Sequence, residues 1–111
     1  MKSFQVVWSR EAAKDLEEIF EFIRQDNPAA ARVWFNKVRN SCSKLKTNPA
    51  RFPVVPELVD LGITHYRIAS VTPYRVLFKL WQSKVFVIAV LDGRRDLEGF
   101  LFNRLLRMDE R

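Results

Sequence analysis

The amino-acid sequence predicts a two-layer α+β domain, in which a pair of helices packs on one face of an antiparallel sheet. Three observations lead to this fold class. A short apolar stretch is followed by two segments with helical periodicity, three later segments are rich in β-branched and aromatic residues, and the last segment is again helical. The 111 residues contain no linker, repeat or low-complexity tract, so we expect one domain over residues 1–111.

The first elements are a strand and a helix. Residues 4–8, FQVVW, have the composition of a short buried strand. Ser9 is the expected N-cap of the following helix, because its hydroxyl can accept a hydrogen bond from an orphan backbone N–H. Apolar residues then recur at helical spacing and define one buried face. These residues are Ala12, Leu16, Ile19, Phe20 and Ile23.

A second helix follows directly. Asn27 is its expected N-cap, and Pro28 takes the first helical position, where a missing N–H costs nothing. An apolar stripe runs from Ala31 to Leu45, and Thr47-Asn48-Pro49 ends the helix. The short joint predicts an antiparallel helix hairpin. The outer face of this helix is basic and comprises Arg32, Lys37, Arg39, Lys44 and Lys46. These side chains are either simply solvated or form a contact surface for nucleic acid.

Three strands are expected in the second half. A proline-spaced loop over residues 49–62, with room for a short edge strand, precedes the segments THYRIAS, YRVLFKLW and KVFVIAVLD. Gln82-Ser83 has the composition of a two-residue turn between the last two segments. The resulting register predicts a face toward the helix hairpin with the pairs Leu80–Val85, Phe78–Val87, Val76–Ala89 and Tyr74–Leu91.

The opposite sheet face is predicted to be apolar at one end and basic at the other. Such a face is expected to be covered by a terminal helix, a partner, or both, because a fully solvated face would not carry several large apolar side chains. Its residues are Arg75, Leu77, Lys79, Trp81, Lys84, Phe86, Ile88 and Val90.

The last helix is expected over residues 97–108, with Asp96 as its N-cap. Its apolar residues extend over more than half of the circumference, whereas one packing surface needs a stripe of only about 100°. The helix therefore either lies in a groove or offers a second face to another chain.

Several classes of protein are disfavoured. A single cysteine, Cys42, leaves no internal disulfide and is expected as a small packing residue in a reducing compartment. One histidine and one cysteine cannot build a closed metal site, and phosphate-loop and coenzyme fingerprints are missing, so no metal and no cofactor is expected. The first residues are too short and too soon charged for a membrane span or signal peptide, which favours a cytoplasmic location without membrane contact.

The net charge of +6 is unevenly placed, with −2 on residues 1–26 and +8 on residues 27–111. The excess is either an ordinary basic surface or a face that meets nucleic acid or an acidic partner.

The order and spacing of the segments VWSREAAKDLEEIFEFI, NPAAARVWFNKV, LKTNPARFP, YRIASVTPYRVLFKL and VFVIAVLDGRRDL resemble the RelE/ParE family of bacterial toxins from type II toxin–antitoxin systems. This resemblance covers nearly the whole chain. It implies a β-α-α-β-β-β order with an antiparallel meander and a C-terminal helix, and a first strand that lies beside the last.

The family resemblance also implies two modes of action. RelE-like members cut messenger RNA on the ribosome with basic residues on the sheet and a tyrosine in the last helical segment, whereas ParE-like members bind DNA gyrase. In this chain Arg67, Arg75 and Arg95 match the basic set, and His65 is the only imidazole. Ala69 stands where a second lysine is expected, and Phe100, Leu101 and Phe102 stand where the tyrosine is expected.

The missing proton carriers favour the ParE-like branch, a gyrase-binding toxin without intrinsic catalysis. A metal-independent, ribosome-dependent endoribonuclease is the alternative, and it requires Arg67 and Arg75 on the same sheet face. An inactive protein-interaction module is a third hypothesis. Arg94 and Arg95 either form surface ion pairs with Asp92 and Asp96 or hold a partner.

The expected partners are a cognate antitoxin with an acidic, amphipathic segment, and DNA gyrase. A homodimer within the toxin–antitoxin complex and direct contact with nucleic acid are further options. A rigid binding patch needs aromatic and arginine anchors. The candidates for contact with target or antitoxin are Arg75, Lys79, Trp81, Phe86, Arg94, Arg95, Phe100 and Phe102.

Overall fold

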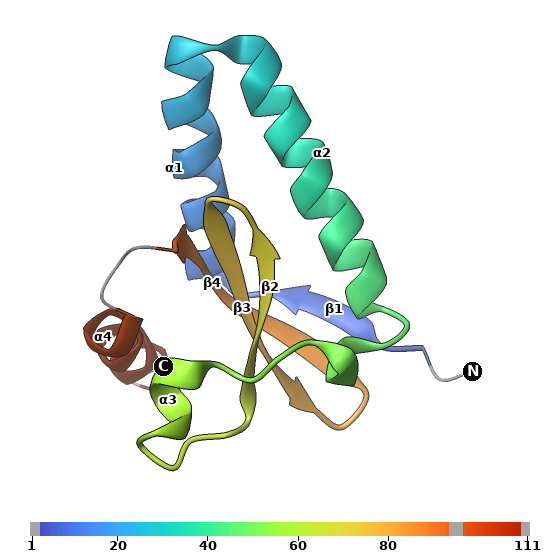
Figure 1. Ribbon diagram of the computed structural model, residues 1–111, viewed down its shortest axis with the longest axis vertical. Helices are drawn as coiled ribbons and strands as arrows, with labels where there is room; N and C mark the ends of the chain where they lie inside the picture. The colour runs from blue at the N-terminus through green and yellow to red at the C-terminus, as the bar shows by residue number, and fades with distance from the viewer. Residues whose placement is uncertain (1–2, 94–96, 110–111) are drawn as a thin grey trace.

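The computed structural model describes residues 3–93 and 97–109. A four-stranded sheet is built from β1 (Gln5–Trp8), β2 (Tyr66–Val71), β3 (Tyr74–Trp81) and β4 (Lys84–Asp92) in the spatial order β1-β4-β3-β2 (Figure 1). Strands β2, β3 and β4 form the predicted antiparallel meander, and β1 runs parallel to β4. The first strand therefore lies beside the last, as expected.

The helix hairpin is formed by α1 (Arg10–Asp26) and α2 (Pro28–Leu45), which are joined by Asn27 alone. Both predicted caps are confirmed. The Ser9 side chain accepts a hydrogen bond from the Ala12 N–H at 3.0 Å, and the Asn27 side chain accepts one from the Ala30 N–H at 3.1 Å. Each cap thus satisfies a backbone donor that the first helical turn leaves free.

The hairpin packs on one face of the sheet through an apolar core. From α2 come Trp34, Val38 and Leu45, which are buried against Phe78 and Val87 of the sheet. The Trp34 ring meets the Tyr74 ring edge-on, with centroids 5.1 Å apart. Figure 1 shows the hairpin extending well beyond the end of the sheet, so its outer surface is not covered by the rest of the described chain.

The predicted register of β3 and β4 is correct in one half and wrong in the other. Leu80 pairs with Val85 and Phe78 with Val87, as expected, but Leu77 pairs with Ala89 and Val76 with Val90. An extra residue, Ile88, makes a β-bulge in β4, and beyond it every side chain changes face. The predicted pairs Val76–Ala89 and Tyr74–Leu91 are therefore wrong. Val90 packs with the hairpin, whereas Ala89 and Leu91 lie on the other face.

The second sheet face is covered by two helices. The segment predicted as a proline-spaced loop contains a 3-10 turn at Pro49–Arg51 and a short helix, α3 (Pro56–Val59). The C-terminal helix, α4 (Leu97–Asp109), agrees with the prediction and buries Leu97 and Leu101 against this face. The expectation that a terminal helix covers the face is thus confirmed, and α3 and α4 contact each other.

Candidate functional site

Arg75 lies on the covered face, where it is half-buried and holds α3 and the end of β4 together. Its Nη1 donates to Glu57 Oε2 at 2.9 Å, and its Nη2 donates to the Gly93 carbonyl at 2.8 Å. A Cβ on Gly93 would stand 3.1 Å from the Pro73 carbonyl, so the glycine allows this close approach. The Arg75 charge is therefore already matched by a carboxylate of its own chain.

Arg67 lies on the opposite face from Arg75. It pairs with Phe78 across the β2–β3 ladder, whereas Arg75 pairs with Ser70, three residues further along β2. Because side chains alternate along a strand, the odd separation places the two arginines on different faces. Arg67 donates to the Phe52 carbonyl on the hairpin side. The shared face that the endoribonuclease hypothesis requires is not formed.

The remaining polar candidates are separate from one another. His65 precedes β2, is exposed, and lies beside the Tyr66 ring at a centroid distance of 4.4 Å. Lys79 is half-buried on β3 and pairs with Tyr66 and Phe86 in the ladders. Tyr66 itself is buried in the second core cluster. No arrangement of these side chains gives a base and an acid that face a common space among the described residues.

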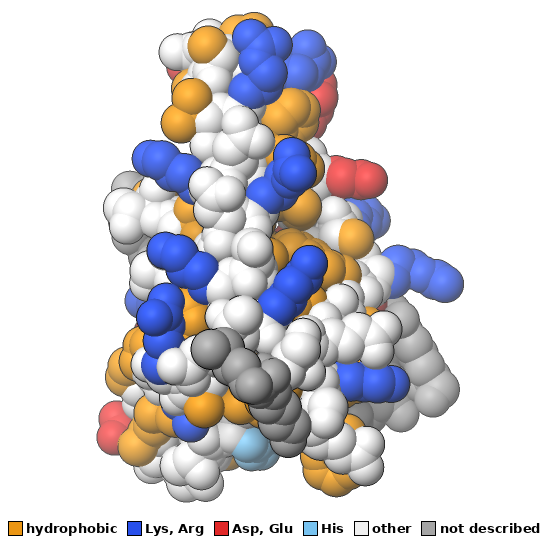
Figure 2. Space-filling model, turned by 90° about the vertical axis from the view of Figure 1, so that its right-hand side faces the viewer, with side chains coloured by type: hydrophobic (Ala, Val, Ile, Leu, Met, Phe, Trp, Pro, Cys, Tyr) orange, Lys and Arg blue, Asp and Glu red, His pale blue; other side chains and the backbone are white. Residues whose placement is uncertain are grey.

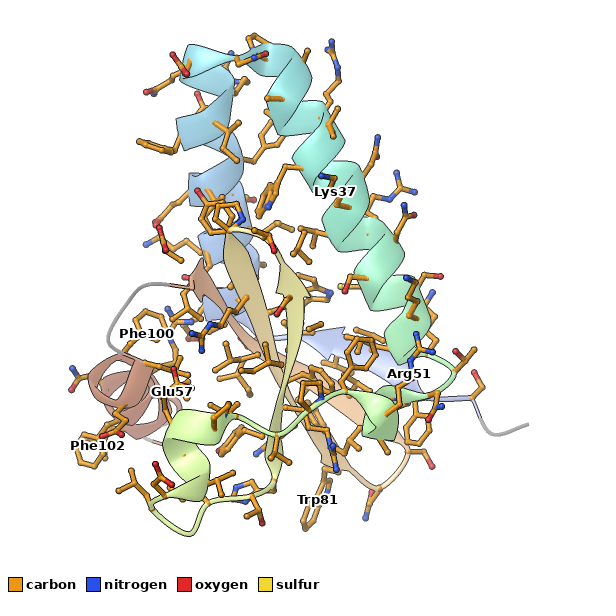
Figure 3. All side chains as sticks on the ribbon, viewed as in Figure 1. Lys37, Arg51, Glu57, Trp81, Phe100 and Phe102 are labelled. Atoms are coloured by element: carbon orange, nitrogen blue, oxygen red, sulfur yellow. The ribbon has the colours of Figure 1, made fainter. Side chains whose placement is uncertain are left out.

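The aromatic candidates divide into packed and exposed groups. Phe86 is partly buried against the second core cluster, and Phe100 lies under the guanidinium of Arg104 at 4.8 Å. Trp81 and Phe102 have 62% and 66% of their surface exposed. Figure 3 shows these two side chains far apart, at the end of β3 and on α4. Those predicted anchors that the structure describes therefore do not form one continuous patch.

Arg94 and Arg95, together with the expected cap Asp96, lie outside the described residues. Their proposed role as anchors thus remains a prediction. The preceding Asp92-Gly93 ends β4 as expected, and the Gly93 N–H donates to the Pro73 carbonyl at 2.9 Å.

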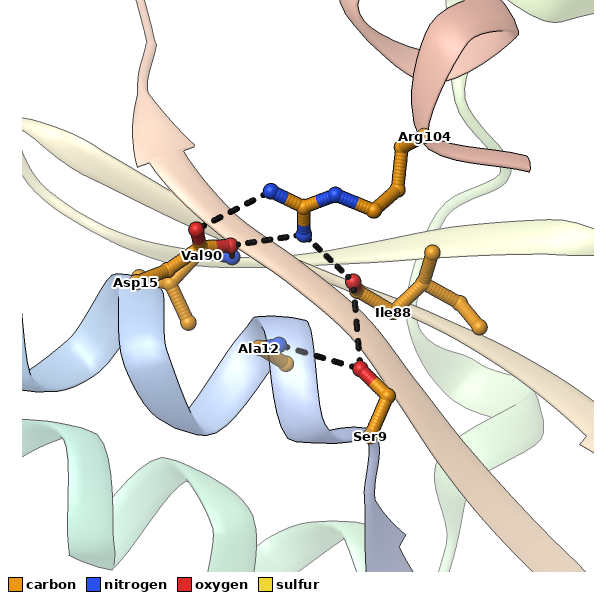
Figure 4. A network of polar contacts seen from close by, with 6 residues as sticks. All are labelled: Ser9, Ala12, Asp15, Ile88, Val90 and Arg104. Atoms are coloured by element: carbon orange, nitrogen blue, oxygen red, sulfur yellow. Dashed lines mark hydrogen bonds and ion pairs between the residues drawn. The ribbon is translucent and has the colours of Figure 1, made fainter. Parts of the chain in front are cut away.

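Arg104 of α4 is a residue that the sequence reasoning missed. Only 5% of it is exposed, and its guanidinium makes a two-pronged ion pair with Asp15 of α1, through Nη1–Oδ2 at 2.9 Å and Nη2–Oδ1 at 3.0 Å. Nη1 also donates to the Ile88 carbonyl at 3.0 Å (Figure 4). Bidentate pairs of this kind are strong and fix the relative orientation of the two side chains.

The end of β1 leaves backbone groups of β4 that this ion pair satisfies. Strand β1 ends at Trp8, opposite Val87, so no neighbouring strand continues along this edge beyond Val87 in the described sheet. The Val90 N–H donates instead to Asp15 Oδ2 at 3.1 Å, and the Ile88 carbonyl accepts from Arg104. The side chains of Asp15 and Arg104 thus satisfy backbone groups at this edge, and Ser9 Oγ is a second donor to the Ile88 carbonyl at 3.5 Å.

A sequence signal for this network did exist. In α4, Leu97, Leu101 and Arg104 follow the i, i+4, i+7 spacing of the buried stripe, and in α1 Asp15 stands beside Leu16 on the buried face. A charged residue at a core position requires a partner of opposite charge. Sequence alone, however, offers several carboxylates for that role.

The described part of the chain contains no group of three or more His, Cys, Asp or Glu side chains that could hold a metal ion. Burial raises the pKa of the Cys42 thiol to about 11, against a smaller opposing effect of Lys46. The thiol is therefore protonated at neutral pH, in agreement with a packing role. Within the described residues, no helix combines the length and hydropathy needed to cross a membrane.

Comparison with known proteins places this fold among toxins. The sequence profile of the family described as "ParE toxin of type II toxin-antitoxin system, parDE" matches residues 6–97. No curated protein matched the chain in a sequence comparison.

Two solved structures share the fold. A chain of the chromosomal ParDE toxin–antitoxin system from P. aeruginosa is similar with a TM-score of 0.67 at 15% identity, over 81% of this chain and 96% of that one. A chain of the RelBE2 toxin–antitoxin complex from Mycobacterium tuberculosis is similar with a TM-score of 0.55 at 19% identity, over 81% and 98%. Since the family profile spans most of the chain and the architecture agrees, the protein belongs to the ParE toxin family of type II toxin–antitoxin systems.

Proposed function

We propose that this toxin stops growth by binding DNA gyrase, and that a cognate antitoxin neutralises it. The match of residues 6–97 to the ParE family carries the proposal. The gyrase target is what the resemblance to the ParE-like branch implies.

The chemistry of the sheet supports a binder over a nuclease. Cleavage of RNA without a metal needs a proton acceptor, a cation on the phosphate and a proton donor within one space. Here Arg67 and Arg75 lie on opposite faces, and Arg75 is paired with Glu57. Among the described side chains of α4 there is no tyrosine to transfer a proton.

Helix α4 offers the surface that we propose for the target. Phe102 and Leu106 are exposed large apolar residues on this helix, at 66% and 49%. They lie four residues apart and therefore on one face, on the side away from the buried Leu101 and Arg104. Exposed aromatic and aliphatic side chains on a rigid helix are suitable anchors for a protein interface.

For the antitoxin we propose a segment that covers the edge formed by α3 and α4. Val59 and Leu61, at and just after the end of α3, are exposed as well, and α3 contacts α4 (Figure 1). An amphipathic antitoxin helix or strand would bury these side chains. It would compete with gyrase for Phe102.

The test is a supercoiling assay with purified gyrase, relaxed plasmid and the purified toxin. We expect inhibition of supercoiling and accumulation of cleaved plasmid, both reversed by the antitoxin. The variant Phe102→Ser/Leu106→Ser should lose this inhibition. Phe22→Ser is the control, because it removes an exposed aromatic residue from α1 and should leave inhibition unchanged.

Two other results would replace the proposal. Cleavage of messenger RNA on purified ribosomes, with gyrase unaffected, would establish the endoribonuclease alternative. Normal growth of cells that express the toxin without antitoxin would indicate an inactive interaction module.

A further inference from the structure

The basic character of the chain is concentrated in one segment. Residues 27–56 contain six Lys and Arg residues and no Asp or Glu, so this segment alone accounts for a charge equal to the net +6 of the protein. Five of the six lie on α2 or at its end, and all six are exposed. None of them has an ion-pair partner among the described residues.

The cations on α2 form two straight rows. Arg32, Arg39 and Lys46 are spaced by seven residues, which places them nearly above one another at intervals of about 10.5 Å along the helix axis. Lys37 and Lys44 repeat this spacing in a second row, turned by about 140° around the axis from the first.

The tertiary structure confirms that the rows lie on opposite flanks of α2. Arg39 and Lys46 line a hollow that β1 borders through Val6 and Trp8. Lys37 lines a different hollow, next to the turn between β2 and β3 at Pro73. Figure 2, which looks onto α2, shows Lys and Arg side chains on both sides of an uncharged strip.

The strip between the rows is neutral and made of small or medium side chains. It comprises Val33, Asn36, Asn40 and Ser43, which are all exposed. An uncharged ridge flanked by two parallel rows of cations is complementary to two parallel lines of negative charge that have a gap between them. The gap must admit a helix about 10–12 Å in diameter.

The major groove of B-form DNA has this form, because it is about 12 Å wide and bordered by the phosphates of both strands. We propose that α2 docks in the major groove of duplex DNA, with the two rows on the two phosphate backbones and the neutral strip toward the base edges. Asn36 and Asn40 carry the amide groups that can pair with adenine there. An acidic peptide would match one row but not both. The proposal does not depend on gyrase.

The experiment measures binding of the purified, full-length toxin to a fluorescent DNA duplex of about two helical turns by anisotropy. The five cations of α2 can make five phosphate contacts. We therefore expect the logarithm of the binding constant to fall against the logarithm of salt concentration with a slope of about −4.5. The variant Lys37→Gln/Lys44→Gln should reduce this slope by about 2 and weaken binding by at least about tenfold at about 0.1 M salt.

The control variant is Lys14→Gln/Lys84→Gln, which removes the same charge from exposed sites on α1 and β4. It should leave the affinity nearly unchanged, and circular dichroism should show that both variants are folded. An RNA duplex of the same sequence should bind at least about tenfold more weakly than the DNA duplex, because the deep, narrow major groove of A-form RNA does not admit side chains.

Equal losses in the two variants would show that net charge alone attracts DNA, and would overturn the proposal. Equal affinity for the RNA duplex would reject docking in the groove. Failure to bind DNA would also reject it, and capture of polyglutamate without DNA binding would indicate an acidic protein as the partner of this face.

Discussion

On one face of the sheet, Phe78 is buried among apolar side chains of the helix hairpin, whereas beside the other face Arg104 reaches Asp15 through a buried ion pair. The hairpin is held on the sheet by buried apolar surface. Helices α1 and α2 contribute Ala12, Trp34, Val38 and Leu45 to this core cluster. Helix α4 buries Leu97 and Leu101 but is also held by directional contacts. Apolar burial is non-directional, whereas a bidentate pair fixes the relative orientation of its two side chains.

The largest expected effect is on the hairpin side. Phe78→Ala removes a fully buried ring that also meets Phe52 edge-on at 5.9 Å, and should reduce the free energy of unfolding by about 3–5 kcal/mol. Leu77→Ala, one residue earlier and equally buried on the other face, should cost less, because its side chain is smaller. Urea titrations of both variants provide the measurement. A larger loss of stability for Leu77→Ala than for Phe78→Ala would contradict the prediction that the hairpin side has the larger effect.

The ion pair of α4 is next in size. Asp15→Asn leaves the buried Arg104 charge without a counter-charge, which should reduce stability by about 3 kcal/mol. Because the contact joins α4 to the rest of the chain, hydrogen exchange should increase first in α4 and not in α2.

A second substitution separates charge from packing. In Asp15→Asn/Arg104→Met the uncompensated charge is removed, and the asparagine can still accept from the Val90 N–H. We expect at least half of the lost stability to return. A double variant less stable than Asp15→Asn would mean that the arginine contributes through contacts other than the pair.

Glu57→Gln tests the more exposed pair on the covered face. The side chains of Arg75 and Glu57 are 25% and 34% exposed, so solvent screens their attraction. The expected loss is about 1 kcal/mol or less, and added salt should shrink the difference between variant and parent protein in thermal unfolding. A loss as large as that of Asp15→Asn would show that the two pairs are equally shielded.

The smallest effect at neutral pH is expected at Cys42. Its pKa is raised to about 11 in the folded protein from an ordinary value of 9.0, so the folded state holds the thiol proton more tightly than the unfolded state. Any stability this contributes is complete below pH 9 and is lost as the pH rises from about 9 to 11. At pH 8, alkylation should be about 100-fold slower in the folded than in the urea-unfolded protein, as two pKa units imply. Equal rates would place Cys42 in solvent.

Much of the helix hairpin could be predicted from local patterns. Ser9 and Asn27 were identified as caps because a side-chain acceptor placed just before an apolar helical stripe is a short-range signal. The Gln82-Ser83 turn was identified in the same way, and it gave the correct register of β3 and β4 up to Phe78–Val87.

The spatial arrangement of the candidate residues was less accessible from the sequence. Arg75 and Phe86 do lie on the covered face, but Trp81 is far from Phe102, and Arg67 faces the hairpin. A list of suitable residue types contains no information about the distances between elements. Which candidate residues come into contact is decided by the tertiary structure.

The sequence by itself determined the order of elements, the helix ends and the apolar stripe of the hairpin, because caps and periodicity act between residues a few positions apart. The tertiary structure alone decided the bulge at Ile88, and with it the face of Ala89 and Leu91. It alone paired Arg104 with Asp15, 89 residues away. Such contacts depend on backbone groups left open by the end of β1, and a linear pattern does not show where a neighbouring strand stops.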